Sequence, residues 1–156
     1  MALLPHAVPS KYAGTVSDFL KAPGIKDGSL FQRYESVAVA DNSSVGTRLG
    51  LIPFTKGFSL AQGATQLHVT DLDTGATVTL NVGYTYYDSA VAGEASDPDA
   101  FASLLSGQTA ALLSLDEHAG LGWTAKGDGW LTVSIAGAAV TTAGTLKGQI
   151  AGTYAQ

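Results

Sequence analysis

The chain has 156 residues, a net charge of −5 and no cysteine, which disfavours a nucleic-acid partner and excludes disulfides, thiolate metal sites and cysteine nucleophiles. No apolar run approaches the ~20 residues that cross a membrane, and the first residues lack the basic region of a secretory signal. Charged residues make up only 13% of the chain, against the roughly 25% of ordinary soluble domains, so neutral side chains must cover a surface suited to packing against neighbours.

Residues 1–30 differ from the rest of the chain because prolines and glycines interrupt them repeatedly. Such a segment cannot build a core, yet it carries more apolar side chains than a solvated tail keeps. Two interpretations stay open: a flexible terminus, or an arm that docks on a partner. The residues expected to contact that partner are Leu3, Leu4, Val8, Tyr12, Phe19 and Leu20. Residues 31–156 form the second unit, a single folded domain.

Residues 31–40 read as a first strand, and residues 45–54 as a second that stops at Pro53. Because proline cannot donate to a strand ladder, this end is expected at a sheet edge. In residues 66–84, alternating apolar and polar side chains flank the turn Asp71-Leu72-Asp73-Thr74-Gly75. Asp and Gly are typical turn residues, so we predict a β-hairpin here. The apolar side chains expected to face one interior are Leu67, Val69, Val78, Leu80 and Val82.

Three tyrosines close this stretch at residues 84–87, either as a contact patch or, as we favour, as sheet-face aromatics with their hydroxyls in water. Residues 89–96 are read as a small-residue loop. Residues 97–107 are predicted to be a helix, because Asp97 is a good cap, Pro98 suits the first position and Gly107 a helix end. Its apolar face would consist of Phe101, Leu104 and Leu105.

Residues 109–115 are predicted as a strand, and Trp123–Lys126 with Trp130–Ile135 as a second hairpin. Residues 145–154 read as the last strand, in which Gly148 and Gly152 permit close approach of a neighbouring backbone. Seven to nine short strands with one short helix indicate a mainly β fold, a single β-sandwich or jelly-roll-like domain with an extended N-terminal arm.

The sequence contains no motif that indicates catalysis or metal binding. His6, His68 and His118 show no metal-binding spacing. Asp71, Asp73 and Gly75 resemble the start of a calcium loop, but the later ligands are missing and turn capping explains them. No serine elbow, phosphate loop or marked carboxylate pair is present. We therefore expect no catalytic residues, no metal and no cofactor.

The stretch from Val45 to Tyr84 resembles a group of small structural proteins of tailed bacteriophages, which are usually taken as head decoration or cement proteins. That group shows a strand, I-P-K-G, a D-L-D turn and a strand ending in D-V-G. The corresponding residues here are Ile52-Pro53, Lys56-Gly57, Asp71-Leu72-Asp73 and Asn81-Val82-Gly83. Phe54-Thr55 is inserted before Lys56, and Asn81 replaces the usual Asp.

This resemblance implies a non-enzymatic domain that binds the major capsid protein on the outside of an icosahedral virion, commonly as a homotrimer. It also implies synthesis in the host cytoplasm. Two alternatives remain: another virion component, such as a tail or head–tail part, and a carbohydrate-binding sandwich that stacks sugars on Trp123, Trp130 and the tyrosines.

Overall fold

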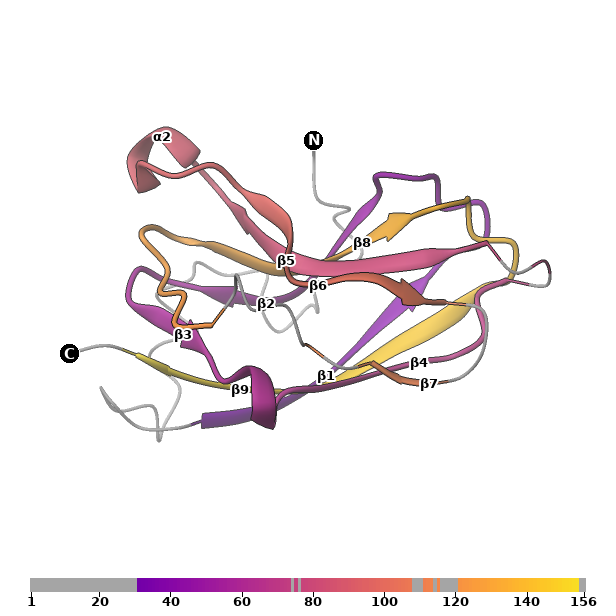
Figure 1. Cartoon of the computed structure of the whole chain (residues 1–156), viewed down its shortest axis with the longest axis horizontal. Helices are drawn as coiled ribbons and strands as arrows, with labels where there is room; N and C mark the ends of the chain where they lie inside the picture. Colours follow the sequence, from indigo (N-terminus) through magenta and orange to yellow (C-terminus); the bar gives the residue numbers. More distant parts are fainter. Residues whose placement is uncertain are drawn as a thin grey trace.

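The computed structural model describes residues 31–73, 75, 77–107, 111–113, 115 and 121–154 as two antiparallel sheets packed face to face (Figure 1). We refer to these two layers as the first and second sheet. The first sheet has the strand order β1 (Phe31–Val39), β9 (Gly144–Tyr154), β4 (Gln66–Val69) and β7 (Ala111–Leu113), and β3 (Phe58–Leu60) also pairs with β9. The second sheet has the order β2 (Arg48–Phe54), β8 (Gly129–Ala136), β5 (Thr79–Tyr86) and β6 (Asp97–Ser106). The short helices are η3 (Gln62–Ala64) and α2 (Ser89–Ala92). The predicted β-sandwich is confirmed.

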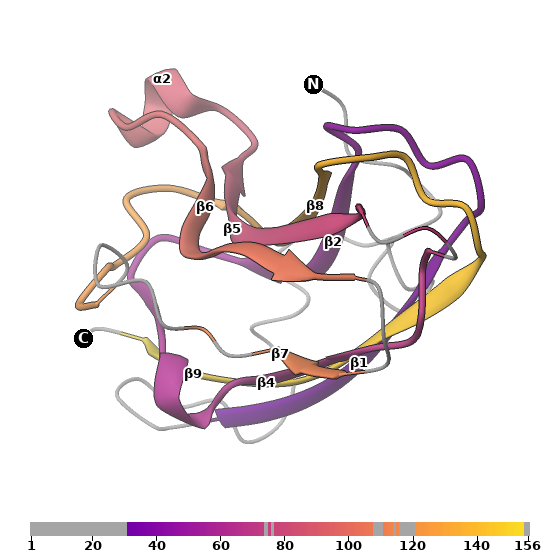
Figure 2. The ribbon, with the colours of Figure 1, turned by 45° about the vertical axis from the view of Figure 1, so that its right-hand side comes forward.

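The predicted hairpin at residues 66–84 is wrong, although both of its strands exist. β4 pairs with β7 and β9, whereas β5 pairs with β6 and β8, so the two strands belong to different sheets. The turn between them crosses from one sheet to the other (Figure 2). Alternation specifies which side chains are buried but not which strand lies alongside. The burial prediction therefore holds, and Leu67, Val69, Val78, Leu80 and Val82 are all 0% exposed.

The predicted helix at residues 97–107 is also wrong, because this segment is the edge strand β6. Its pairs with β5 include Leu105 with Leu80 and Ala102 with Val82, and Phe101 is fully buried. Pairing and burial override the local capping signals, which are weak priors against tertiary context. Proline at position 98 is tolerated because β6 lies at the sheet edge.

The helix that does form is α2, inside the segment predicted as a loop. The Asp88 carboxylate accepts hydrogen bonds from the backbone N–H groups of Ala90 (2.9 Å) and Val91 (3.2 Å), and Gly93 ends the helix at φ 66°. These are ordinary start and stop signals. With only four residues between them, the sequence offers no apolar periodicity by which to detect the helix.

Most other strand predictions are confirmed with shifted ends. β1 and β9 match closely, β2 starts three residues late, and β7 is a shorter version of the predicted strand. In the second predicted hairpin only β8 is a strand, because residues 123–126 are irregular and Ala125 donates its N–H to the Phe58 carbonyl (2.7 Å). The close approach predicted at two glycines is real. A Cβ on Gly148 would lie 2.7 Å from Leu67 Cδ2, and one on Gly152 would lie 2.4 Å from Phe58 Cε2.

Candidate functional site

The six apolar residues predicted to contact a partner belong to residues 1–30, which lie outside the described part of the chain. They are Leu3, Leu4, Val8, Tyr12, Phe19 and Leu20. The prediction that they dock on a partner stays a prediction. The described residues present other polar and aromatic clusters.

The densest polar cluster surrounds Glu94, which follows α2 at one end of the sandwich. Glu94 Oε1 accepts hydrogen bonds from the hydroxyls of Tyr84 (2.5 Å) and Tyr86 (3.3 Å) and from the Trp123 indole N–H (3.3 Å). Glu94 Oε2 forms an ion pair with Lys126 Nζ at 2.5 Å. One side chain from the α2 loop therefore joins β5 to the segment that precedes β8.

We call the cluster of Glu94, Tyr84, Tyr86, Trp123 and Lys126 the Glu94 joint, and electrostatics fix the protonation states of its members. Burial by itself raises the pKa of Glu94, but the hydrogen bonds from Lys126, Tyr84 and Trp123 outweigh that effect and leave the pKa below its usual range. Burial, with the adjacent Glu94 charge, raises the pKa of Tyr84 far above the ordinary value. Glu94 thus stays an ionised acceptor and Tyr84 a protonated donor at neutral pH. Neither group is poised to exchange a proton near pH 7, as general acid–base catalysis requires.

Aromatic packing holds the same joint from beneath. The Trp123 ring stacks on Tyr84 with centroids 4.5 Å apart, and it meets the edges of Phe101 at 5.2 Å and Phe54 at 5.5 Å. The interpretation of the tyrosines as water-facing is therefore wrong for Tyr84 and Tyr86, which are each 5% exposed. Their hydroxyls bind Glu94, a partner that the sequence pattern did not indicate.

The joint supports an exposed tip formed by residues 87–91. Tyr87 is 57% exposed and Val91 is 79% exposed, and α2 projects from the end of the sandwich (Figure 2). Ala92 anchors the other side of the helix, because a Cβ on Gly127 would lie 2.9 Å from the Ala92 Cβ. This tip is a candidate contact surface that sequence reasoning missed.

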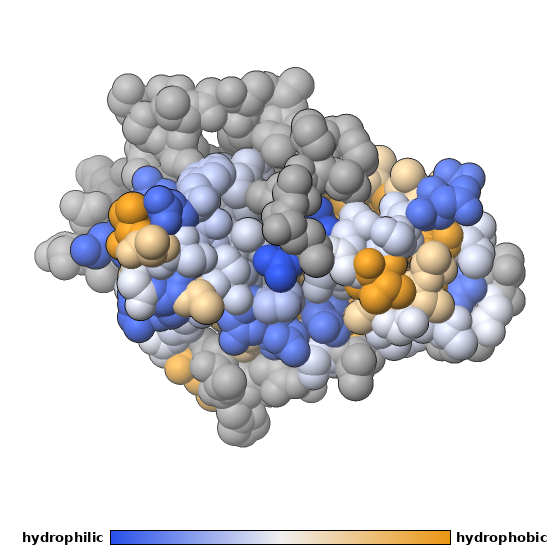
Figure 3. Space-filling view, turned by 90° about the horizontal axis from the view of Figure 1, so that it is seen from above, coloured by the Kyte–Doolittle hydropathy of each residue, from blue (hydrophilic) through white to orange (hydrophobic). Residues whose placement is uncertain are grey.

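Trp130 does not offer an open platform for a sugar. Trp130 is only 4% exposed, and its ring covers Gly50, whose hypothetical Cβ would lie 2.7 Å from Trp130 Cε3. Beside it, Arg48 Nη1 donates to Thr85 Oγ1 at 3.0 Å. Seen from the side of the second sheet, the described surface is mostly polar, with hydrophobic colour in a few separate spots (Figure 3). Stacking on a sugar needs an accessible ring face, which Trp130 lacks.

The Asp71–Gly75 turn carries a second cluster, in which Asp73 is 5% exposed. The Asp73 carboxylate accepts hydrogen bonds from the backbone N–H groups of Gly75 (2.9 Å), Thr77 (2.7 Å) and Val78 (3.1 Å), and from Thr141 Oγ1 (2.9 Å). Together these hydrogen bonds hold the pKa of Asp73 well below its usual range, and the bond from the Thr77 N–H contributes most. The carboxylate is thus used in fastening the crossover between the sheets to the loop before β9.

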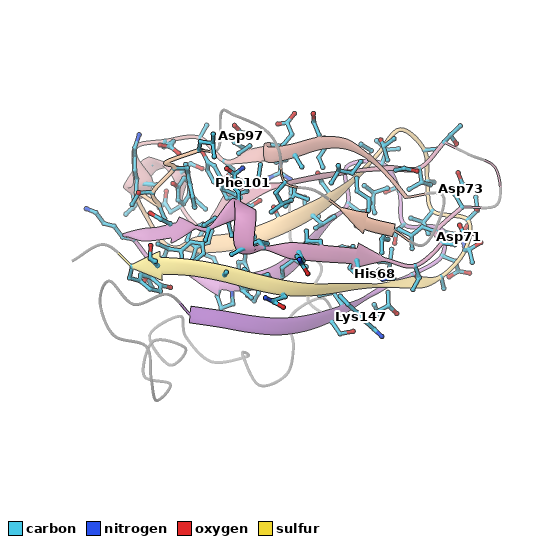
Figure 4. All side chains as sticks on the ribbon, turned by 60° about the horizontal axis from the view of Figure 1, so that its bottom comes forward. His68, Asp71, Asp73, Asp97, Phe101 and Lys147 are labelled. Carbon is cyan, nitrogen blue, oxygen red and sulfur yellow. The ribbon has the colours of Figure 1, made fainter. Side chains whose placement is uncertain are left out.

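The other ionisable groups among the described residues are spread over the sandwich. Figure 4 shows that His68 and Lys147 lie together on the first sheet, that Asp71 and Asp73 share one end, and that Asp97 lies far from them. Burial, together with the neighbouring Asp99, raises the pKa of Asp97. Among the described residues no three His, Asp or Glu side chains converge as metal ligands. His6, Asp116, Glu117 and His118 lie outside the described residues. None of the described helices has the length and apolar character of a membrane span.

Comparison with known proteins yields likenesses in structure alone. No protein-family model matches the chain, and no curated protein sequence matches it. A chain in the capsid asymmetric unit of cyanophage Pam1 is similar over 98% of this chain and 100% of its own length, with 24% identity and a TM-score of 0.58. A chain in the capsid of Ralstonia phage GP4 is similar over 84% of this chain and 88% of its own, with 18% identity and a TM-score of 0.61. The fold described here is thus shared with chains found in two phage capsids.

Proposed function

We propose that this chain is a capsid decoration protein, a non-enzymatic virion component that attaches to the outside of an icosahedral phage capsid and stabilises it. The observation that carries the proposal is the end-to-end similarity to a chain in the Pam1 capsid asymmetric unit. The match covers 98% of this chain and all of the Pam1 chain, so the two chains are similar over their full compared lengths and not in one part only.

The chemistry of the described residues supports a structural role. Glu94 and Asp73, whose pKa values are shifted downward, are both committed to hydrogen bonds that join loops to the sandwich. Structural hydrogen-bond networks perturb carboxylate pKa values, and both of these carboxylates bind groups of the fold itself. The low share of charged residues also fits a subunit that is packed among neighbours.

The partners in this proposal are the major capsid protein and further copies of the chain, which associate as a homotrimer. Residues 1–22 act as an arm along the capsid protein or the adjacent subunit. Proline at positions 5 and 9 restricts the unbound backbone, which lowers the entropy lost when an extended segment docks.

Reconstitution of particles tests this function. Particles that lack the chain are incubated with the full chain or with a variant lacking residues 1–22, and bound protein is counted per capsid subunit. We expect saturable binding of the full chain and at least tenfold weaker binding of the variant, which corresponds to about 1.4 kcal/mol.

The folding control is the melting temperature of the shortened variant, which we expect to match that of the full chain. A shortened variant that coats particles equally well contradicts the arm, and one that unfolds places the arm in the domain's own core. A copy number of only a few per particle would instead indicate a tail or head–tail component.

A further inference from the structure

The four strands at the ends of the two sheets differ in how well they resist pairing with another chain. β2 contains Pro53 and a register shift between Gly50 and Ile52. β6 contains Pro98 and two register shifts against β5, and β7 has only three residues. Proline, bulges and short length are three of the devices by which proteins protect sheet edges, and charged side chains, such as Arg33 and Glu35 of β1, are another.

β1 has none of the first three devices. Its nine residues pair with β9 in unbroken register, from Phe31 opposite Gly152 to Val39 opposite Gly144. Among the described strands it pairs with β9 alone. A regular sheet edge of this length is a template for strand addition, in which backbone N–H and C=O groups supply the affinity. Ser36 and Ala38 of this strand are small and exposed.

Charge and chain length indicate what this edge receives. Residues 1–30 hold three of the eight basic residues and two of the thirteen acidic ones, so this segment carries +1 and residues 31–156 carry −6. Two domains of the same kind therefore repel each other, whereas each attracts the N-terminal segment of its neighbour. Residues 10–22 are free of proline and longer than β1. The eight residues from 23 to 30 span up to about 26 Å when extended, which sets how far residues 10–22 can extend beyond their own β1.

We propose that the open edge of β1 receives residues 10–22 of a second copy of this chain as an added strand. This inference rests on the proposed function, since it specifies how neighbouring subunits are linked. The contact joins two different surfaces, and a contact of that type closes into a ring when the rotation between subunits permits, as in a trimer. The arm would then bind the adjacent subunit and not the capsid protein.

Disulfide trapping tests the proposal cleanly, because the natural chain has no cysteine. One preparation of the full chain carries Ser36→Cys in β1. A second carries Ala13→Cys, Ser17→Cys or Ala22→Cys, a panel that samples the register of the arm. The two are mixed, oxidised with a glutathione buffer and analysed by mass spectrometry. The matched control replaces Ser36→Cys by Ala95→Cys, an exposed position in the loop after α2.

We expect one member of the panel to form mixed disulfide dimers with Ser36→Cys at least tenfold more than with Ala95→Cys. Equal yields with both would overturn the proposal. A further variant carries Ser36→Cys and the best arm cysteine in one chain. Linkage confined to that single chain, with no mixed dimers, would also overturn the proposal, because the arm would then pair with its own domain. The experiment uses no particles, so its failure leaves capsid binding untouched, and a failure of capsid binding leaves the trapped dimer as evidence for arm exchange.

Discussion

Leu67→Ala is expected to destabilise the domain strongly, because Leu67 is fully buried on β4, the strand that pairs with β9 in the first sheet. The truncation removes three carbons, about 2.4 kcal/mol of transfer free energy, and leaves a cavity. The opposing residue is Gly148, whose hypothetical Cβ would lie 2.7 Å from Leu67 Cδ2. With backbone as the facing wall the cavity cannot collapse, so we expect a loss of about 3–4 kcal/mol and a melting temperature lower by roughly 10 °C or more.

The neighbouring residue supplies the matched control. Gln66 is exposed on the opposite face of β4, and Gln66→Ala should change the free energy of unfolding by less than about 0.5 kcal/mol. The double variant Leu67→Ala with Gly148→Ala should be more stable than the sum of the single changes predicts, since the new methyl group occupies the vacated space. Urea unfolding of the natural chain and of the four variants, including Gly148→Ala alone, gives these values. A loss below about 0.5 kcal/mol for Leu67→Ala would refute the register of β4.

Three further outcomes follow from the clusters. Glu94→Gln should lower the free energy of unfolding by about 1–3 kcal/mol, since charge-assisted hydrogen bonds are lost, and should alter the fluorescence of Trp123; an unchanged midpoint in urea contradicts the joint. The pKa of Asp73 is lower in the folded chain than the value of about 3.9 expected on unfolding, so its stabilisation is present above that pH and disappears as pH falls through the folded value. Melting temperatures between neutral and acid pH should therefore fall less steeply for Asp73→Asn, and parallel curves would refute this role. Gly152→Ala should cost about 1–3 kcal/mol through overpacking against Phe58, which calorimetry can measure.

The sequence predicted which residues are buried better than it predicted which strands are neighbours. Period-2 alternation in residues 66–82 identified five fully buried side chains correctly. The same pattern is produced by a hairpin within one sheet and by two strands that face each other across a sandwich. Asp73 shows why the second arrangement occurs, since its carboxylate turns the chain and binds Thr141 beyond β8, a contact 68 residues away.

The helix error at residues 97–107 has a related cause. Asp97, Pro98 and Gly107 are genuine local signals, but Phe101 enters the aromatic cluster as part of a strand paired with β5. The candidate site was missed for the same reason. Glu94, Tyr84 and Trp123 meet only after both sheets have formed, and no spacing in the sequence relates them.

Cryo-electron microscopy of purified particles tests the central claim most directly. If the chain decorates the capsid, density for this β-sandwich will lie on the outer surface, repeated with the icosahedral lattice and clustered in threes. Density for the chain confined to the tail or the head–tail junction, or a capsid surface without it, would contradict the decoration role.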